Sequence, residues 1–246
     1  MGRNAVAAAL HGGRRISALY VRRDSAMRGS IVPLIARARA LDIPIKEVDQ
    51  GKLNRITGGG NHQGVAATVA EKAFVPVSRL LDTARERGEA PFLFVCDGIS
   101  DPHNLGAIIR TASCAGAHGV IIPKHHSVGL TYAVAKGAAG ALEHVGVAQV
   151  PNLTRALQAL KEEGLWIYAA HMAGEAYHRL DYRGPLALII GAEGSGISRL
   201  VLAQADHVVS IPMQGPVGSL NASVAAGILA FEIARSRSPQ PPKGSA

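Results

Sequence analysis

Short apolar runs alternate with segments of helical spacing from Pro91 to Arg235. The runs are almost continuously apolar, which is typical of strands buried on both faces of a parallel sheet. The predicted strands are 92–96, 119–122, 145–150, 165–169, 186–190 and 207–211. The predicted helices are 105–115, 131–138, 153–163, 197–203 and 219–235. This alternation predicts an α/β domain built on a parallel sheet.

A smaller α/β unit is predicted ahead of this domain. Its expected helices are 4–10 and 30–41, its expected strands are 16–21, 45–48 and 65–69, and a glycine-rich loop spans 58–64. Residues 71–90 are charged and are expected to form a linker that contains a helix at 77–87. The Pro-rich, polar tail 237–246 is expected to be disordered. The expected domains are therefore 1–70 and 91–236.

Positive charge is concentrated at the start of the chain. Residues 1–60 carry 11 Lys and Arg against 4 Asp and Glu, whereas residues 61–246 carry 15 against 14. A basic module attached to a neutral domain favours nucleic-acid binding over a merely soluble basic face. No apolar stretch is long enough to span a membrane. Cys96 and Cys114 lie in apolar patterns, and two buried free thiols indicate a reducing compartment, so we expect a cytoplasmic protein.

Three polar, flexible segments each follow a predicted strand: 97–106, 191–196 and 211–221. The carboxyl ends of parallel strands meet at one edge of a sheet, where ligands bind, so the segments predict one ligand pocket. Asn104 and Ser219 are expected to cap the helices that follow them. Arg110 lies in an apolar helix, and this favours a functional role over a structural ion pair because arginine is rarely buried without a partner.

Several other chemistries are disfavoured by the sequence. The turn 191–196 matches neither a P-loop nor the dinucleotide fingerprint, and it comes late in the chain, which argues against a nucleotide-dependent oxidoreductase. The histidines show no zinc-binding spacing, so no metal is expected. No nucleophile motif with its His and acid partners is present either.

Taken in order, 101–112, 191–196 and 211–225 resemble the three signature motifs of the SpoU (TrmH-type) ribose 2′-O-methyltransferases of the SPOUT superfamily. Residues 2–6 and 62–64 resemble the substrate-binding domain of the same family, which has an L30e-like fold. The resemblance covers nearly the whole chain. Within the family it is greatest to enzymes that methylate a guanosine in the peptidyl-transferase loop of 23S rRNA.

The resemblance implies a homodimer, a deep trefoil knot at the carboxyl end of the catalytic domain, and S-adenosylmethionine as cofactor. It places Arg110 as the catalytic group, acting either as a base or as a stabiliser of the alkoxide. The residues that it implies for orienting Arg110 and the ribose are Asn104, Glu193, Ser219 and Asn221. The residues that it implies for the cofactor pocket are Gly191, Ile211 and Leu220, with Ala170, Met213 and Ser219 as neighbours.

RNA is the expected partner, and 23S rRNA is the expected target. Family members that act on tRNA mostly use terminal helical extensions, whereas the complete amino-terminal domain with His62-Gln63-Gly64 favours rRNA. Two alternatives stay open at this stage. One is the same chemistry on tRNA or on another rRNA nucleotide. The other is a non-catalytic RNA-binding protein that has kept the fold.

Overall fold

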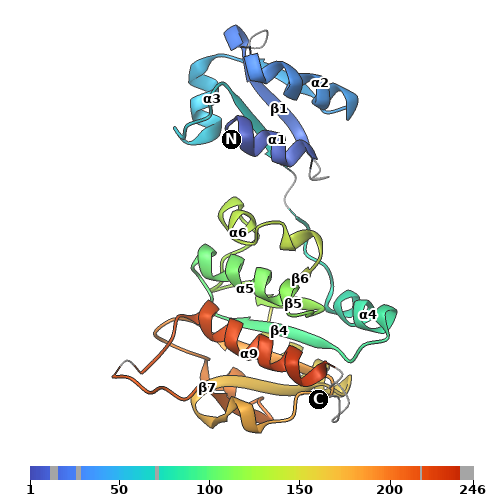
Figure 1. Ribbon diagram of the computed structural model, residues 1–246, viewed down its shortest axis with the longest axis vertical. Coiled ribbons are helices and arrows are strands. Elements are labelled where there is room, and N and C mark those ends of the chain that lie inside the picture. The colour runs from blue at the N-terminus through green and yellow to red at the C-terminus, as the bar shows by residue number, and fades with distance from the viewer. Residues whose placement is uncertain (12–15, 26–28, 70–71, 217, 239–246) are drawn as a thin grey trace, which may run out of the picture. The chain divides into compact units, whose positions relative to one another are not determined.

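The computed structural model describes residues 1–11, 16–25, 29–69, 72–216 and 218–238 (Figure 1). Contacts within the chain divide it into two units, Met1–Glu71 and Lys72–Ala246. Each unit contains a hydrophobic core of its own. The segment expected to be a linker holds a helix, α4 (Val77–Arg87), whose Leu80 and Leu81 are buried in the core of the second unit.

The first unit is a three-stranded sheet with helices packed on it. Its strands are β1 (Ile16–Arg22), β2 (Ile45–Val48) and β3 (Val65–Val69), and its helices are α1 (Arg3–His11), α2 (Val32–Ala40) and α3 (Gln50–Thr57). Short 3-10 turns, η1 (Arg23–Ser25) and η2 (Gly29–Ile31), precede α2. The central strand β1 pairs parallel with β2 and antiparallel with β3.

The helix α3 was not expected from the sequence. Only Leu53 and Thr57 of α3 are buried, so it lacks the apolar stripe that usually identifies a helix. Its ends define it instead. The Asp49 carboxylate accepts a hydrogen bond from the Lys52 amide at 2.7 Å, and Gly58 ends the helix in the left-handed conformation.

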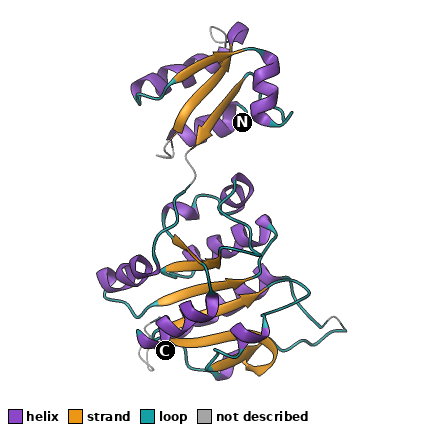
Figure 2. Ribbon diagram, turned by 180° about the vertical axis from the view of Figure 1, so that it is seen from behind, coloured by secondary structure: helices purple, strands orange, loops and turns teal. Residues whose placement is uncertain are grey.

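The second unit confirms the predicted parallel α/β domain. Its six strands are all parallel, in the order β6-β5-β4-β8-β7-β9. They are β4 (Phe92–Asp97), β5 (Gly119–Pro123), β6 (Gly146–Val150), β7 (Trp166–Ala176), β8 (Leu186–Gly191) and β9 (His207–Ser210). Figure 2 shows these strands side by side in one sheet.

Helices cover both faces of this sheet. One face carries α5 (Pro102–Cys114), α6 (Tyr132–Gly137) and α9 (Ala222–Arg237), and the other carries α4, α7 (Leu153–Glu162) and α8 (Arg199–Leu202). Successive residues of β4 alternate between the two cores, so that Phe94 packs under α5 and Val95 packs on the opposite side. Two 3-10 turns, η3 (Ala141–Glu143) and η4 (Tyr177–Arg179), complete the unit.

Three sequence predictions need correction. The cap of α5 is Asp101, whose side chain accepts from the His103 amide, because Asn104 is buried inside the helix. The cap of α9 is Asn221 and not Ser219. Cys96 is buried as expected, but Cys114 is exposed because it lies on the outer face of α5.

The carboxyl end of α9 is anchored by a half-buried arginine. The guanidinium of Arg237 donates to the backbone carbonyls of Ala90, Pro91, Tyr182 and Gly184. Burial lowers the pKa of Arg237 to about 10. Arg237 had been assigned to the tail, and it is the last residue of α9; residues 239–246 of that predicted tail lie outside the described residues. No described helix has the length and apolar character to cross a membrane.

Candidate active site

The three polar segments emerge from one edge of the larger sheet. The first follows β4, the second follows β8 and the third follows β9, and these strands lie within the neighbouring set β4-β8-β7-β9. Ala170 pairs with Val209 where β7 runs beside the end of β9. The carboxyl ends of neighbouring parallel strands therefore bring together residues that are more than 100 positions apart in the sequence.

One side chain joins all three segments. The Nδ2 group of Asn221 donates to Oδ1 of Asn104 at 2.9 Å and also to Oε1 of Glu193. Its Oδ1 atom accepts from the amides of Ser223 and Val224 at 2.9 and 3.2 Å, and so caps α9. Asn104 is buried, whereas Glu193 and Asn221 are exposed. The structure therefore holds an amide and a carboxylate in fixed positions at the edge of the sheet.

The glycine-rich turn after β8 folds back on itself. Ala192 and Gly196 exchange backbone hydrogen bonds of 3.1 and 2.9 Å, and Gly194 and Gly196 have φ angles of +81° and +66°. A Cβ atom on Gly191 would lie 2.3 Å from the carbonyl carbon of Gly196, so only glycine fits there. These contacts fix the backbone that carries Glu193.

An acidic residue at the end of β4 ties this turn to the first segment. The Asp97 carboxylate accepts a hydrogen bond from the Ser198 amide at 2.7 Å. Sequence reasoning placed Asp97 at a strand end but assigned it no partner. The signal was an acid that follows a buried apolar strand, and the partner lies 101 residues further along the chain.

The loop from β9 to α9 offers many backbone groups to a ligand. Among the described residues, 212–220 make no backbone-to-backbone hydrogen bond, so their peptide groups are available to bind a ligand or water. Ile211 and Met213 are half-buried, and Ser219 and Leu220 are exposed. Ala170 and Gly191 lie on the neighbouring strands β7 and β8, at the same carboxyl edge of the sheet.

Arg110 is not bonded to this cluster. It is exposed on α5, and no hydrogen bond or ion pair joins it to any other described residue. The alternative of a structural ion pair thus finds no partner within the described part of the chain. Ser219 likewise makes no side-chain hydrogen bond there. The cluster of Asn104, Glu193 and Asn221 is therefore assembled within one chain, while Arg110 is free to meet a substrate or a second molecule.

No metal centre is built from the described residues. Among them, no group of three or more His, Cys, Asp and Glu side chains is positioned to hold a metal ion.

A parallel sheet with three motif segments joined at its carboxyl edge is the architecture of a SPOUT-type methyltransferase. The chain belongs to the SpoU rRNA methylase family, whose model matches residues 91–231, and residues 1–75 match the substrate-binding domain of RNA 2′-O ribose methyltransferases. This confirms the predicted family and the RNA 2′-O-methyltransferase class.

Individual relatives agree with this assignment. A 23S rRNA (guanosine-2′-O-)-methyltransferase, RlmB, from Ralstonia nicotianae is 43% identical over 99% of this chain and 97% of its own length. An uncharacterized tRNA/rRNA methyltransferase, slr0955, from Synechocystis is 46% identical over 96% of this chain, which spans 62% of that protein. The crystal structure of an AdoMet-bound rRNA methyltransferase from Sinorhizobium meliloti superposes with a TM-score of 0.74 at 27% identity, covering 94% of this chain and 84% of that one.

Proposed function

We propose that this protein transfers a methyl group from S-adenosylmethionine to a ribose 2′-hydroxyl of RNA, and that the target is a guanosine in the peptidyl-transferase loop of 23S rRNA. The observation that carries the proposal is the hydrogen-bonded cluster of Asn104, Glu193 and Asn221, which unites the three family motifs at one sheet edge. The guanosine target is supported by the Ralstonia relative, a 23S rRNA (guanosine-2′-O-)-methyltransferase that matches this chain over almost its full length.

The cofactor would lie against the ends of β7, β8 and β9. Gly191, Ile211 and Leu220 would line its pocket, with Ala170, Met213 and Ser219 beside them. Peptide groups of the loop 212–220 would bind the adenine, and this explains why no acidic ribose-binding signature is needed. When bound, S-adenosylmethionine supplies an electrophilic methyl group. The trefoil knot expected for this region stays a prediction.

Arg110 would act on the attacking hydroxyl. A guanidinium is a cation with five N–H donors and it holds its protons tightly, so it stabilises a forming alkoxide more readily than it removes a proton. The proton of the hydroxyl would pass to a phosphate oxygen of the RNA. Asn104, Glu193, Ser219 and Asn221 would orient the ribose, and they would orient Arg110 through the bound ribose because no hydrogen bond joins them to Arg110 directly. Because the ribose must be held in line with the methyl donor, this positioning supplies much of the rate.

The basic first unit would hold the RNA. Its residues 1–60 carry nearly all of the net charge of +8, and phosphate contacts fix the register of a nucleic acid on a protein surface. The catalytic domain at 91–236 would then receive the selected nucleotide. The cytoplasmic location stays a prediction, and an RNA substrate is consistent with it.

A second copy of the chain would complete the enzyme. Val224 and Phe231 are 49% and 55% exposed, and they lie seven residues apart on one side of α9. The helix α9 packs against α5, which carries the unpartnered Arg110. Large exposed apolar side chains, on a helix that packs against the one carrying a candidate catalytic residue, are typical of an interface that forms part of the active site.

The printed name of the Synechocystis relative leaves tRNA as a second target for the same chemistry. Incubation of the protein with methyl-labelled S-adenosylmethionine and unmodified 23S rRNA or tRNA, followed by mapping of ribose methylation, distinguishes the two. A single 2′-O-methylguanosine in 23S rRNA is the expected product. Label in tRNA alone would overturn the rRNA target but keep the chemistry, and cofactor binding without methylation of either RNA would favour a non-catalytic role.

Arg110→Ala tests the catalytic assignment in the same assay. We expect methyl transfer to fall by about 100-fold or more, as for loss of a group that stabilises an oxyanion, with cofactor affinity unchanged. Arg155→Ala removes another exposed arginine, which lies on α7 on the opposite face of the sheet, and should behave as wild type. An Arg110→Ala enzyme with normal turnover would contradict the assigned role.

A further inference from the structure

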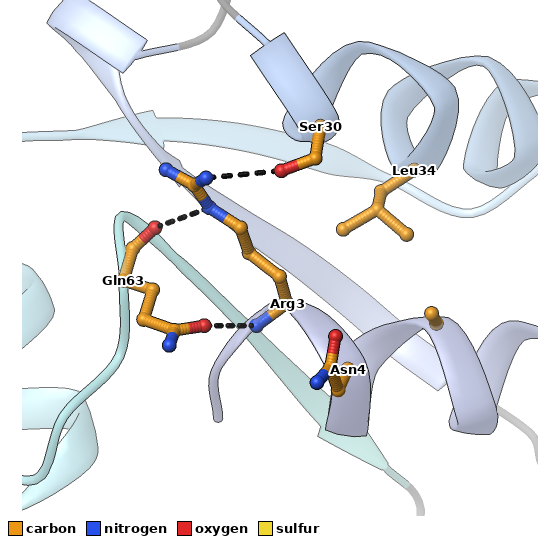
Figure 3. Close-up of a pocket in the computed structure, with 6 residues that line it drawn as sticks. Arg3, Asn4, Ser30, Leu34 and Gln63 are labelled. Carbon is orange, nitrogen blue, oxygen red and sulfur yellow. Dashed lines mark hydrogen bonds between the residues drawn. The ribbon is translucent and has the colours of Figure 1, made fainter.

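A hollow with mixed polar and apolar lining opens on the first unit, where the start of α1 faces the loop before β3 (Figure 3). Its volume is about 610 Å³, within the range of pockets that bind small organic ligands. Its lining consists of Arg3, Asn4, Ala7, Ser30, Leu34 and Gln63. The charged and amide groups of Arg3, Asn4 and Gln63 share the lining with the apolar side chains of Ala7 and Leu34, so the hollow offers both hydrogen bonds and apolar contacts.

The guanidinium of Arg3 is held in place at the wall of this hollow. Its Nε donates to the Gln63 carbonyl oxygen at 3.2 Å, and its Nη1 donates to Oγ of Ser30 at 2.9 Å (Figure 3). These two bonds use two of its five N–H groups, and the others have no protein partner among the described residues. A fixed, exposed guanidinium with free donors is suited to binding a phosphate through two parallel hydrogen bonds.

Gln63 is held in an unusual backbone conformation beside it. Its φ angle is +51°, which few residues other than glycine adopt, and such strain is concentrated at functional sites. Its Oε1 accepts from the Arg3 amide at 3.1 Å, which leaves the Nε2 donors without a partner among the described residues. The side-chain amide of Asn4 also has no hydrogen bond to any described residue.

The loop that carries Gln63 is held in place by hydrogen bonds of the neighbouring His62. His62 is buried, its Nδ1 accepts from the Gly64 amide at 3.0 Å, and its Nε2 lies 2.9 Å from Oδ1 of Asn54. Because Nδ1 is an acceptor, Nε2 carries the proton and donates to Asn54. Both ring nitrogens are thus committed to structure, and His62 positions Gln63 instead of contacting a ligand.

We propose that this hollow binds one unstacked nucleotide of the RNA, with its phosphate on Arg3 and the edge of its base on the amides of Asn4 and Gln63. Ala7 and Leu34 would contact the face of the base. The inference rests on the proposed function and adds base-selective recognition to a unit whose charge alone would bind any RNA. A neighbouring hollow also contains Arg3 and Gln63 in its lining, together with residues 59–64, and it would bind the adjoining nucleotide.

The chemistry of the hollow favours RNA loops over paired stems. Amide side chains read the hydrogen-bonding edge of a base, and that edge is accessible in RNA only where the base is unpaired and splayed out. A free anion would use Arg3 but would leave the amides and the apolar side chains without a role. The hollow therefore selects a strand with an exposed base, as is found in the loop proposed as target.

Two substitutions separate the phosphate and base contributions. Equilibrium binding of the full-length protein to a transcript of the peptidyl-transferase domain of 23S rRNA is measured over a range of salt concentrations. Arg3→Ala should weaken binding about tenfold or more and reduce the salt slope by about one. Asn4→Ala should weaken binding about tenfold with the slope unchanged, and it breaks no hydrogen bond between described residues. Arg39→Ala, an exposed charge at the far end of α2, is the charge-matched control and should stay within twofold of wild type.

Chemical probing of the bound transcript identifies the nucleotide. One unpaired base should be protected by wild type and by Arg39→Ala, and it should become reactive again with Asn4→Ala. If wild type binds and methylates the transcript while Arg3→Ala and Asn4→Ala bind like Arg39→Ala, the nucleotide site is overturned and the proposed function stands. If wild type neither binds nor methylates RNA, both proposals fail.

Discussion

Single residues at the site differ sharply in how far the sequence alone could place them. Asn104 was predicted as a helix cap, and it is instead a buried amide whose partner Asn221 lies 117 residues away. Asp, Asn and Ser all make good caps, so the choice among Asp101, Asn104 and the positions near them could not be made locally. Which of these residues caps the helix is determined by contacts between distant segments, and a local sequence pattern does not indicate such contacts.

The two cysteines are expected to differ in reactivity. Burial raises the pKa of the Cys96 thiol to about 12, whereas Cys114 is exposed. Because the thiolate is the reactive form, the folded protein should react with one equivalent of a disulfide reagent at pH 8, and the unfolded protein with two. Cys114→Ser should abolish the reaction of the folded protein and Cys96→Ser should leave it unchanged. Fast reaction of folded Cys114→Ser would contradict the burial of Cys96.

His118 is expected to make the protein less stable in mild acid. It is buried, its Nδ1 accepts from the Phe92 amide at 3.0 Å, and burial lowers its pKa below the ordinary 6.5 in spite of the nearby Glu89. The unfolded chain therefore binds a proton at a higher pH than the folded one, so this contribution to stability is lost as pH falls through 6.5 and below.

Urea denaturation between pH 7.5 and 5.5 measures this effect. His118→Asn keeps an acceptor for the Phe92 amide and cannot be protonated, so its unfolding free energy should fall less over this range than that of wild type. Equal pH dependence of the two proteins would rule out the role of His118.

Among the elements, those with a continuous apolar pattern were predicted and those defined by their ends were not. All six strands of the larger sheet were expected, because each contains a short apolar run between segments of helical spacing. The helix α3 buries only Leu53 and Thr57 and was missed. The strand β7 was predicted to end at 169 but continues to Ala176. Its pairing with β9 is interrupted by an irregularity between Ala170 and Glu175 and then continues to Ala176. Such an extension depends on a neighbouring strand and leaves little trace in the sequence.

The contact between α5 and α6 depends on a glycine. A Cβ atom on Gly106 would lie 2.8 Å from the Val134 carbonyl oxygen and 2.9 Å from the Gly137 Cα atom. Gly106→Ala is therefore expected to lower the free energy of unfolding by about 1–3 kcal/mol, as overpacking typically does. Chemical denaturation provides the measurement.

Gly227→Ala is the matched control within α9. An added Cβ there meets nothing within 4 Å, and alanine is the better helix former, so stability should rise by up to about 1 kcal/mol. Similar losses of stability in both variants would show that the close approach of α5 and α6 is not the cause.

At the scale of the whole molecule, the division into two units follows the division of charge. The basic residues of 1–60 belong to a unit that ends at Glu71, and the neutral remainder forms the catalytic unit. The distribution of charge thus predicted a basic nucleic-acid-binding module attached to a neutral domain. Charge did not predict that α4 packs into the core of the second unit, because most residues of α4 are polar or charged and only a few, among them Leu80 and Leu81, are buried.

The proposed dimer can be tested by introducing a charged side chain on the exposed apolar side of α9. Phe231→Glu places a carboxylate on the exposed apolar side of α9 and should convert a dimer into a monomer in sedimentation equilibrium. Leu200→Glu alters a side chain that is 73% exposed on α8, on the other face of the sheet, and should leave the dimer intact. A Phe231→Glu protein that remains dimeric would place the interface elsewhere.

The double role of Asn221 makes the first turn of α9 a reporter of the site. One amide side chain both caps the helix and joins Asn104 to Glu193, so fraying of that turn and loosening of the motifs are a single local opening event. Amide hydrogens report such openings through their exchange with solvent. Protection of the Ser223 and Val224 amides should therefore rise when a ligand tightens the motif cluster, and α9 would record the occupancy of the site in its exchange rate.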